Sequence, residues 1–193
     1  MSLQHVTLGL LKYGPLSGYD LNKAFQASVF HFWNTEQSQV YRALYKLAES
    51  GWVDVETIVQ ADLPNKKLYR LTAAGRRELQ RWVATPAPLA ATHEAWLGQL
   101  FFGAELSTDE LIQVLNARIA ALQQMLEHFT TQIPASAAAY AEDFAAPHDL
   151  PFWQLTLEYG IEKLRFDLEW AQRCVATLQK RLDSDVRERD ESS

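Results

Sequence analysis

The sequence contains a single cysteine, Cys174, and no long run of apolar residues. One cysteine permits neither a disulfide within the chain nor a thiolate zinc site, so we expect Cys174 to be a small buried side chain on a helix. A membrane span needs roughly 18 consecutive apolar residues, and a signal peptide needs a basic segment followed by an apolar one. Neither pattern is present, and we expect a soluble, cytoplasmic protein with no membrane partner.

Motifs for enzyme chemistry are also missing. The five histidines share no spacing typical of metal ligands, and they stand at His5, His31, His93, His128 and His148. The "GPLSG" segment at residues 14–18 is not followed by the Gly-Lys-Ser/Thr of a phosphate loop. No nucleophile is paired with a base. We therefore predict no enzyme, no metal site and no cofactor.

The charge is distributed unevenly along the chain. Residues 1–84 hold ten Lys and Arg against seven Asp and Glu, a net charge of +3, whereas residues 85–193 hold eight against seventeen, a net charge of −9. The overall charge of −6 therefore does not exclude a nucleic-acid partner for the first half. Two prolines lie where the net charge changes from positive to negative, and they predict a linker at residues 85–93. It separates a domain at 1–84 from a helical domain at 94–182 and a charged tail at 183–193.

The first 84 residues predict the order helix, helix, helix, β-hairpin, helix. An apolar helix around Val6–Leu11 ends at Gly14-Pro15. A capping-box spacing at Ser17–Asp20 begins the second helix, and Asn34 or Thr35 is the expected cap of the third, which ends at Gly51. Strands are predicted at Trp52–Val59 and Lys67–Leu71, followed by a helix at Ala73–Val83 capped by Thr72. This order indicates a mainly α protein with a winged helix-turn-helix and a two-stranded wing.

Polar side chains predict a DNA-binding surface on the third helix and the wing. Val40, Leu44 and Leu47 share the apolar face of that helix, and the opposite face carries Ser38, Gln39, Arg42 and Lys46. Arg and Lys pair with phosphate or guanine, and Gln reads base edges. The wing tip adds Asn65, Lys66 and Lys67. A solvated helix face explains Arg42 and Lys46 equally well when they are taken alone, and a winged helix can also serve as a protein-binding module.

The second half predicts two long helices that pack antiparallel. A capping box at Ser107–Glu110 precedes apolar residues spaced 3-4-3-4 from Ile112 to Ile133, and a second heptad seam runs from Leu157 to Leu182 on a helix at about 152–182. A short helix and turn are expected between them. The last helix is also apolar on its opposite side, at Phe152, Leu155, Tyr159, Phe166 and Trp170.

A helix with two opposed apolar faces must be buried on both. A second subunit would cover the additional face, which predicts a homodimer; the segment Glu94–Gly103 could instead cover it within the same chain. Aromatic residues at such an interface could form a flat apolar site for a small effector, although core packing explains each of them singly. The candidate effector-binding residues are Trp96, Phe101, Phe102, Trp153, Tyr159, Phe166 and Trp170.

Three segments of the sequence resemble the PadR-like family of transcriptional regulators. They are "LGLLKYGPLSGYDLNKAF" at 8–25, "NTEQSQVYRALYKLAESGWV" at 34–53 and "KLYRLTAAGRREL" at 67–79. The long C-terminal helices, with "LTLEYGIEKLRFDLEW" at 155–170, resemble the dimerisation domain of the larger members. The wing reads Leu-Pro-Asn-Lys-Lys where many relatives carry glycine.

The resemblance implies a homodimeric repressor that binds a pseudo-palindromic operator in double-stranded DNA and is released by a small, frequently aromatic effector. It also makes Tyr19 and Tyr41 candidate phosphate contacts beside Ser38 and Lys66. Packing at the surface is an equal explanation for the two tyrosines.

Overall fold

The computed structural model describes residues 2–29, 32–33, 35–59, 65–89, 93–143 and 146–191. These residues form two compact units: Met1–Pro88 with Pro134–Thr156, and Leu89–Ile133 with Leu157–Ser193. The domain boundaries expected from the sequence stay predictions. None of the helices in the described ranges is long and apolar enough to cross a membrane.

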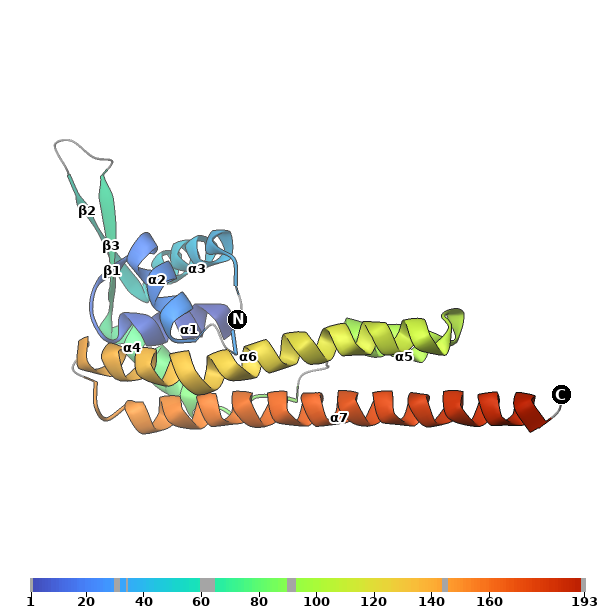
Figure 1. The fold of residues 1–193 in the computed structure, drawn as a ribbon. Coiled ribbons are helices and arrows are strands. Elements are labelled where there is room, and N and C mark those ends of the chain that lie inside the picture. The colour runs from blue at the N-terminus through green and yellow to red at the C-terminus, as the bar shows by residue number, and fades with distance from the viewer. Residues whose placement is uncertain are drawn as a thin grey trace. The chain divides into compact units, whose positions relative to one another are not determined.

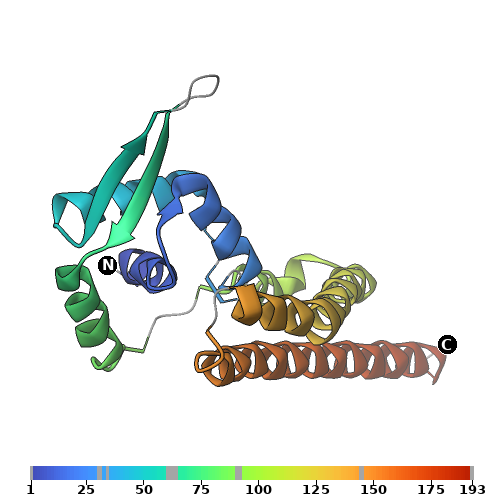
Figure 2. The same ribbon diagram turned by 90° about the vertical axis from the view of Figure 1, so that its left-hand side faces the viewer.

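The first unit contains a winged helix (Figure 1). Its helices are α1 (Ser2–Leu11), α2 (Gly18–Ala27), α3 (Gln37–Glu49) and α4 (Ala73–Val83), and its strands are β1 (Leu16–Ser17), β2 (Val53–Ile58) and β3 (Lys66–Leu71). The strands form an antiparallel sheet in the order β1-β3-β2. The β2–β3 hairpin extends away from the helices of this unit as a wing (Figure 2). The turn at residues 60–64 lies outside the described residues.

The sheet differs from the predicted two-stranded wing by one short strand. Leu16 and Ser17 pair with Tyr69 and Leu68 of β3. Two residues are too few for the alternation by which a strand is recognised in a sequence, so β1 could not be predicted.

Local signals set most of the helix ends in the first unit. Ser17 and Asp20 form the predicted capping box of α2, and the Thr72 side chain accepts from the backbone N–H of Gly75 at the start of α4. Gly51 adopts a φ of 67° after α3, a conformation that favours glycine. The predicted cap of α3 is wrong for Thr35, because Glu36 is the N-cap and the Thr35 hydroxyl donates to Gln39 Oε1 at 2.8 Å instead. Asn34 lies outside the described residues.

The core of the first unit joins the inner faces of α1, α2 and α3. Its fully buried side chains are Leu8, Leu11, Leu21, Phe25, Val40, Leu44 and Leu47. This is the apolar side of α3 predicted from the sequence, and its burial leaves the polar side of α3 exposed.

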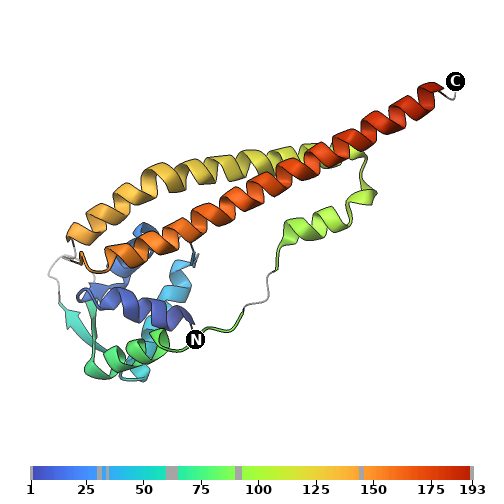
Figure 3. The same ribbon diagram turned by 90° about the horizontal axis from the view of Figure 1, so that it is seen from below.

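In the second unit, helices pack along the predicted heptad seams. It holds α5 (Ala95–Phe101), a 3-10 turn at Gly103–Glu105, and most of α6 (Thr108–Asp143) and α7 (Leu150–Glu191). Helices α6 and α7 lie side by side (Figure 3). Leu122 and Phe129 of α6 are buried with Leu157 and Leu164 of α7, which confirms that the two seams face each other. The capping box at Ser107 and Glu110 is also present.

Helix α6 is longer than predicted. It continues through Pro134 to Asp143, where a separate short helix and turn were expected. The sequence after the proline, residues 135–142, contains five alanines. Alanine has the highest helix propensity, which offsets part of the cost of a proline inside a helix.

A candidate nucleic-acid interface

The outer face of α3 presents the polar residues predicted for a recognition helix. Ser38, Gln39, Arg42 and Lys46 are all exposed, and the buried Val40 and Leu44 point the opposite way. The Thr35 hydroxyl holds the Gln39 amide oxygen, while Arg42 Nε lies 3.4 Å from the Ser38 carbonyl oxygen, a long and weak contact. The guanidinium of Arg42 is therefore only loosely held by its own helix.

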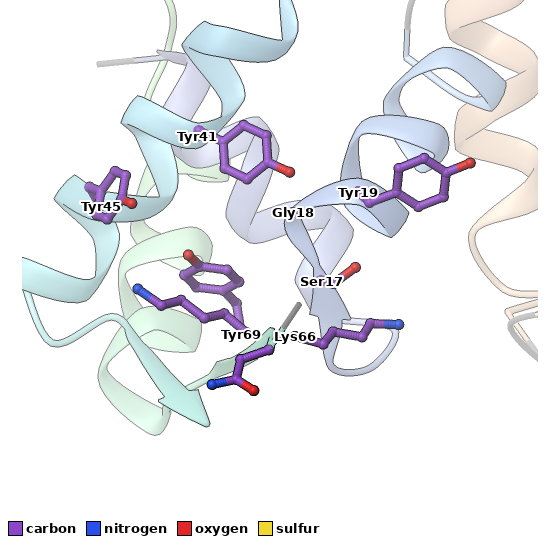
Figure 4. A pocket seen from close by; sticks show the side chains of 9 residues that line it. Ser17, Gly18, Tyr19, Tyr41, Tyr45, Lys66 and Tyr69 are labelled. Carbon is purple, nitrogen blue, oxygen red and sulfur yellow. The ribbon is translucent and has the colours of Figure 1, made fainter. Parts of the chain in front are cut away.

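An open cleft of about 550 Å³ lies between α2, α3 and the wing. It brings together five predicted DNA-binding residues, which are Tyr19, Tyr41, Asn65, Lys66 and Lys67. In Figure 4, the Tyr41 ring of α3 points toward the Gly18–Tyr19 segment, Tyr45 lies further along the same helix, and Tyr69 lies below both of them. Tyrosine hydroxyls, lysines and a helix N-terminus are groups that contact DNA phosphates.

The wall of the cleft at the start of α2 is closely packed at Gly18. A Cβ atom on Gly18 would lie 2.3 Å from Cε1 of Tyr41. The Tyr41 ring therefore packs directly on the backbone of α2, which fixes where its hydroxyl lies. Tyr19, the next residue, is exposed over 68% of its surface.

Asp20 connects α2 to the wing. Its carboxylate oxygen Oδ2 lies 2.9 Å from Lys66 Nζ and accepts a hydrogen bond from the Ser17 hydroxyl at 2.7 Å. Hydrogen bonds from the Ser17 hydroxyl, and then from Lys66, lower the pKa of Asp20 below its ordinary value. Lys67, the neighbouring residue, extends toward α3, with its Nζ 6.0 Å from the centre of the Tyr45 ring.

Four residues of the cleft were missed by the sequence analysis: Ser17, Gly18, Tyr45 and Tyr69. Tyr45 could have been found, because it follows Tyr41 by four residues and so shares its helix face. Tyr69 is buried at the base of the cleft, and burial raises its pKa, with the neighbouring Tyr45 and Tyr41 adding to the effect. Its place depends on the pairing of β3 with β1, which the sequence did not reveal.

A second cavity, of about 530 Å³, lies within the first unit between α1, the end of α2, α4 and the start of α7. Its wall is mostly apolar and includes Val6, Leu10, Tyr13, Val29, Trp82 and Trp153. Two polar pairs border it. Lys12 Nζ lies 2.6 Å from Asp149 Oδ1, and His5 Nε2 lies 2.9 Å from Glu78 Oε1 while the His5 ring stacks on Trp82.

The candidate effector residues are divided between the two units. Trp153 lines the cavity of the first unit, with its ring edge-on to Tyr13. In the second unit Trp96 packs edge-on against Trp170, and the Arg118 guanidinium lies 3.8 Å from the centre of the Trp96 ring. Phe101 and Phe102 contact each other and are exposed, as are Tyr159 and Phe166. Sequence analysis missed Tyr13 and Trp82 as cavity residues.

Metal ligands do not cluster in the part of the chain that the structure describes, where no group of three or more His, Cys, Asp or Glu could hold an ion. Cys174 is half-buried on α7 rather than fully buried, and burial raises the pKa of its thiol. A thiol of this kind is a weak nucleophile.

Two family models match the chain in succession. Residues 7–81 match the transcriptional regulator PadR-like family, and residues 93–179 match the virulence activator alpha C-term model. The negative transcriptional regulator PadR of Bacillus subtilis is 29% identical over 186 residues, which cover 92% of this chain and 98% of that protein.

Solved structures of B. subtilis PadR are similar along their whole length. The structure in complex with operator DNA has a TM-score of 0.76 at 26% identity and covers 92% of this chain and 99% of that one. The complex with p-coumaric acid has a TM-score of 0.72 at 25% identity, with 93% and 99% covered. The winged helix of this chain is therefore similar to the PadR-like family, its helical region is similar to the virulence activator alpha C-term model, and the relatives matched along the whole chain are transcriptional regulators rather than enzymes.

Proposed function

We propose that the protein is a homodimeric, DNA-binding repressor that acts in the cytoplasm on a pseudo-palindromic operator and is released by a small aromatic effector. The observation that carries the proposal is the joint placement, on one winged unit, of the exposed polar face of α3 and the cleft lined by tyrosines and lysines. The complex of B. subtilis PadR with operator DNA supports it.

Each part of this surface has a distinct role in the proposal. Gln39, Arg42 and Lys46 of α3 enter the major groove, where Gln and Arg read base edges and Lys meets phosphate or guanine. Ser38, Tyr19, Tyr41, Asn65, Lys66 and Lys67 contact the sugar-phosphate backbone, and the lysines of the wing reach an adjoining groove. Residues 1–84 would be the DNA-binding domain, and residues 94–182 the dimerisation domain.

An exposed apolar face on α7 supports dimerisation. Phe152, Leu155, Tyr159 and Phe166 are between 61% and 70% exposed. Trp170 is the fifth residue of this face, and within the described residues it packs against Trp96. Trp96 belongs to the segment 94–103, which could have covered the face within the same chain. The other four residues of the face stay exposed. A second copy would bury the rest and place two recognition helices about 34–36 Å apart, one helical turn of DNA.

The apolar cavity of the first unit is the site we propose for the effector. Aromatic walls from Tyr13, Trp82 and Trp153 suit a planar ring, and the acidic group of a ligand would replace Asp149 as the partner of Lys12 at the border. The B. subtilis PadR structure with p-coumaric acid makes that compound the first probe. By binding one dimer geometry better than the other, the effector would shift the population away from the DNA-competent form.

Fluorescence anisotropy tests the DNA-binding proposal. The protein is titrated at several salt concentrations against a labelled duplex from upstream of its own gene and against a scrambled duplex. Tight, sequence-dependent binding that weakens steeply with salt is the expected result. Weak binding that is equal for both duplexes would instead favour the protein-binding module.

The same assay measures the contribution of Arg42. Replacing Arg42 by alanine is expected to weaken operator binding by about 1–3 kcal/mol. Unchanged affinity at fixed salt would remove Arg42 from the proposed interface.

A further inference from the structure

A negative charge stands beside the cleft, in contact with two of its lining residues, where the proposed function requires contacts with an anion. Asp20 lies in the first turn of α2 beside Tyr19, and its Oδ2 atom receives three donors. They are the Ser17 hydroxyl at 2.7 Å, the Ser17 backbone N–H at 3.4 Å, and Lys66 Nζ at 2.9 Å. Ser17 and Lys66 both line the cleft.

Helix capping explains only part of this arrangement. The start of α2 is capped by the Ser17 hydroxyl, which accepts from the Asp20 backbone N–H at 3.2 Å, and the Asp20 side chain completes the box by accepting from Ser17. A neutral side-chain oxygen could make these bonds as well. The contact with Lys66 adds nothing to the cap, because Lys66 belongs to the wing and is 46 positions further along the chain.

The donors around Asp20 are those that bind a phosphate oxygen. A hydroxyl, a backbone N–H at the N-terminus of a helix and a lysine ammonium make up a common phosphate-binding set. The side chains of Lys66 and Asp20 are partly exposed, at 41% and 38%, so solvent and DNA can reach both of them.

We propose that the Asp20 carboxylate takes the place of a DNA phosphate in the free protein and must release Lys66 to the backbone when a duplex binds. This inference rests on the proposed DNA-binding function. Asp20 competes with the phosphates of the DNA for Lys66 and so lowers the affinity for DNA. Because phosphate contacts carry no sequence information, the affinity is lowered equally for every duplex. It restricts the time spent on non-specific DNA without altering the preference for one sequence over another.

The test is anisotropy with Asp20→Asn, which keeps an oxygen acceptor for Ser17 but removes the charge. Operator and scrambled duplex are both expected to bind roughly two- to five-fold more tightly, the scale of one exposed ionic contact. Asp20→Ser removes the same charge with a different side chain and is measured in parallel, with circular dichroism to check the fold of both.

Controls separate a local effect from the change in total charge. Glu105→Gln, in the second unit, changes the net charge equally and should leave affinity unchanged. In a Lys66→Met background the gain from Asp20→Asn should be smaller, and Lys66→Met alone should weaken binding. The inference would be overturned if Glu105→Gln gave an equal gain in affinity, or if neither folded Asp20 variant gave a gain. It would also be overturned if Lys66→Met bound DNA with unaltered affinity. Failure of the wild-type protein to bind any duplex would contradict the proposed function itself.

Discussion

At the scale of single residues, the contact between Gly18 and Tyr41 determines the shape of the tyrosine cleft. Any side chain at position 18 would meet the Tyr41 ring, since even a Cβ would lie 2.3 Å from Cε1. The absence of a side chain at one position therefore controls the orientation of another residue on a different helix.

Gly18→Ala is expected to lower the free energy of unfolding by about 1–3 kcal/mol, because Tyr41 or α2 must move. Gly9→Ala on α1 is the matched control, since a Cβ there meets nothing within 4 Å. It should raise stability by roughly 0.5–1 kcal/mol, because alanine replaces glycine inside a helix. Urea denaturation followed by circular dichroism measures both, and equal effects of the two substitutions would refute the assigned contact.

Glu78 makes the stability of the first unit depend on pH. Hydrogen bonds from Arg81, and then from His5, lower the pKa of Glu78 to about 2. A carboxyl whose pKa is lower in the folded than in the unfolded state stabilises the fold above its unfolded pKa, near 4.3, and loses that contribution as pH falls toward 2.

Glu78→Gln should therefore flatten the dependence of stability on pH between about 4.5 and 2. Arg81→Gln removes the principal partner and should flatten it in part. Thermal unfolding at stepped pH checks both variants. A Glu78→Gln profile with the wild-type slope would show that the carboxylate does not contribute.

At the scale of helices, α7 has one apolar face that packs on α6 and another that is exposed. We expect Phe166→Glu to shift the protein from dimer to monomer, because a charge in an apolar interface is left without a partner. Gln172→Glu is the control, being exposed on the same helix but away from this face. Sedimentation velocity distinguishes the two states. A dimer that persists in Phe166→Glu would require another interface.

The same scale explains what the sequence could predict. Heptad seams and capping boxes are encoded within short stretches of sequence, so the helices of the first unit, the α6–α7 pairing and the exposed polar face of α3 were predicted correctly, whereas the length of α6 and the N-cap of α3 were not. The contacts that build the cleft and the cavity join residues far apart in the chain, such as Lys66 with Asp20 or Tyr13 with Trp153. Nothing local in the sequence encodes these pairs, and the effector candidates were accordingly chosen by residue type rather than by position.

At the scale of the whole protein, the proposal links the cavity to the release of DNA. Adding p-coumaric acid to the protein–operator complex should lower its anisotropy, and Trp153→Ala should weaken this effect by about ten-fold or more, the loss of a buried aromatic contact. Trp170→Ala is the matched variant in the second unit. If Trp170→Ala removed the response and Trp153→Ala did not, the effector would bind among the aromatic residues of the second unit instead.

The compact unit that holds the winged helix also includes Pro134–Thr156, a segment from the far half of the sequence. Trp153 packs on the core of that unit, and Asp149 pairs with Lys12. A fragment cut at the linker would therefore expose the apolar wall that Trp153 covers, and it should aggregate more readily than the full chain. In evolution, a helical region acquired from another regulator could replace this one only if it supplied equivalents of Trp153 and Asp149, so the two halves are expected to be inherited together rather than exchanged as independent modules.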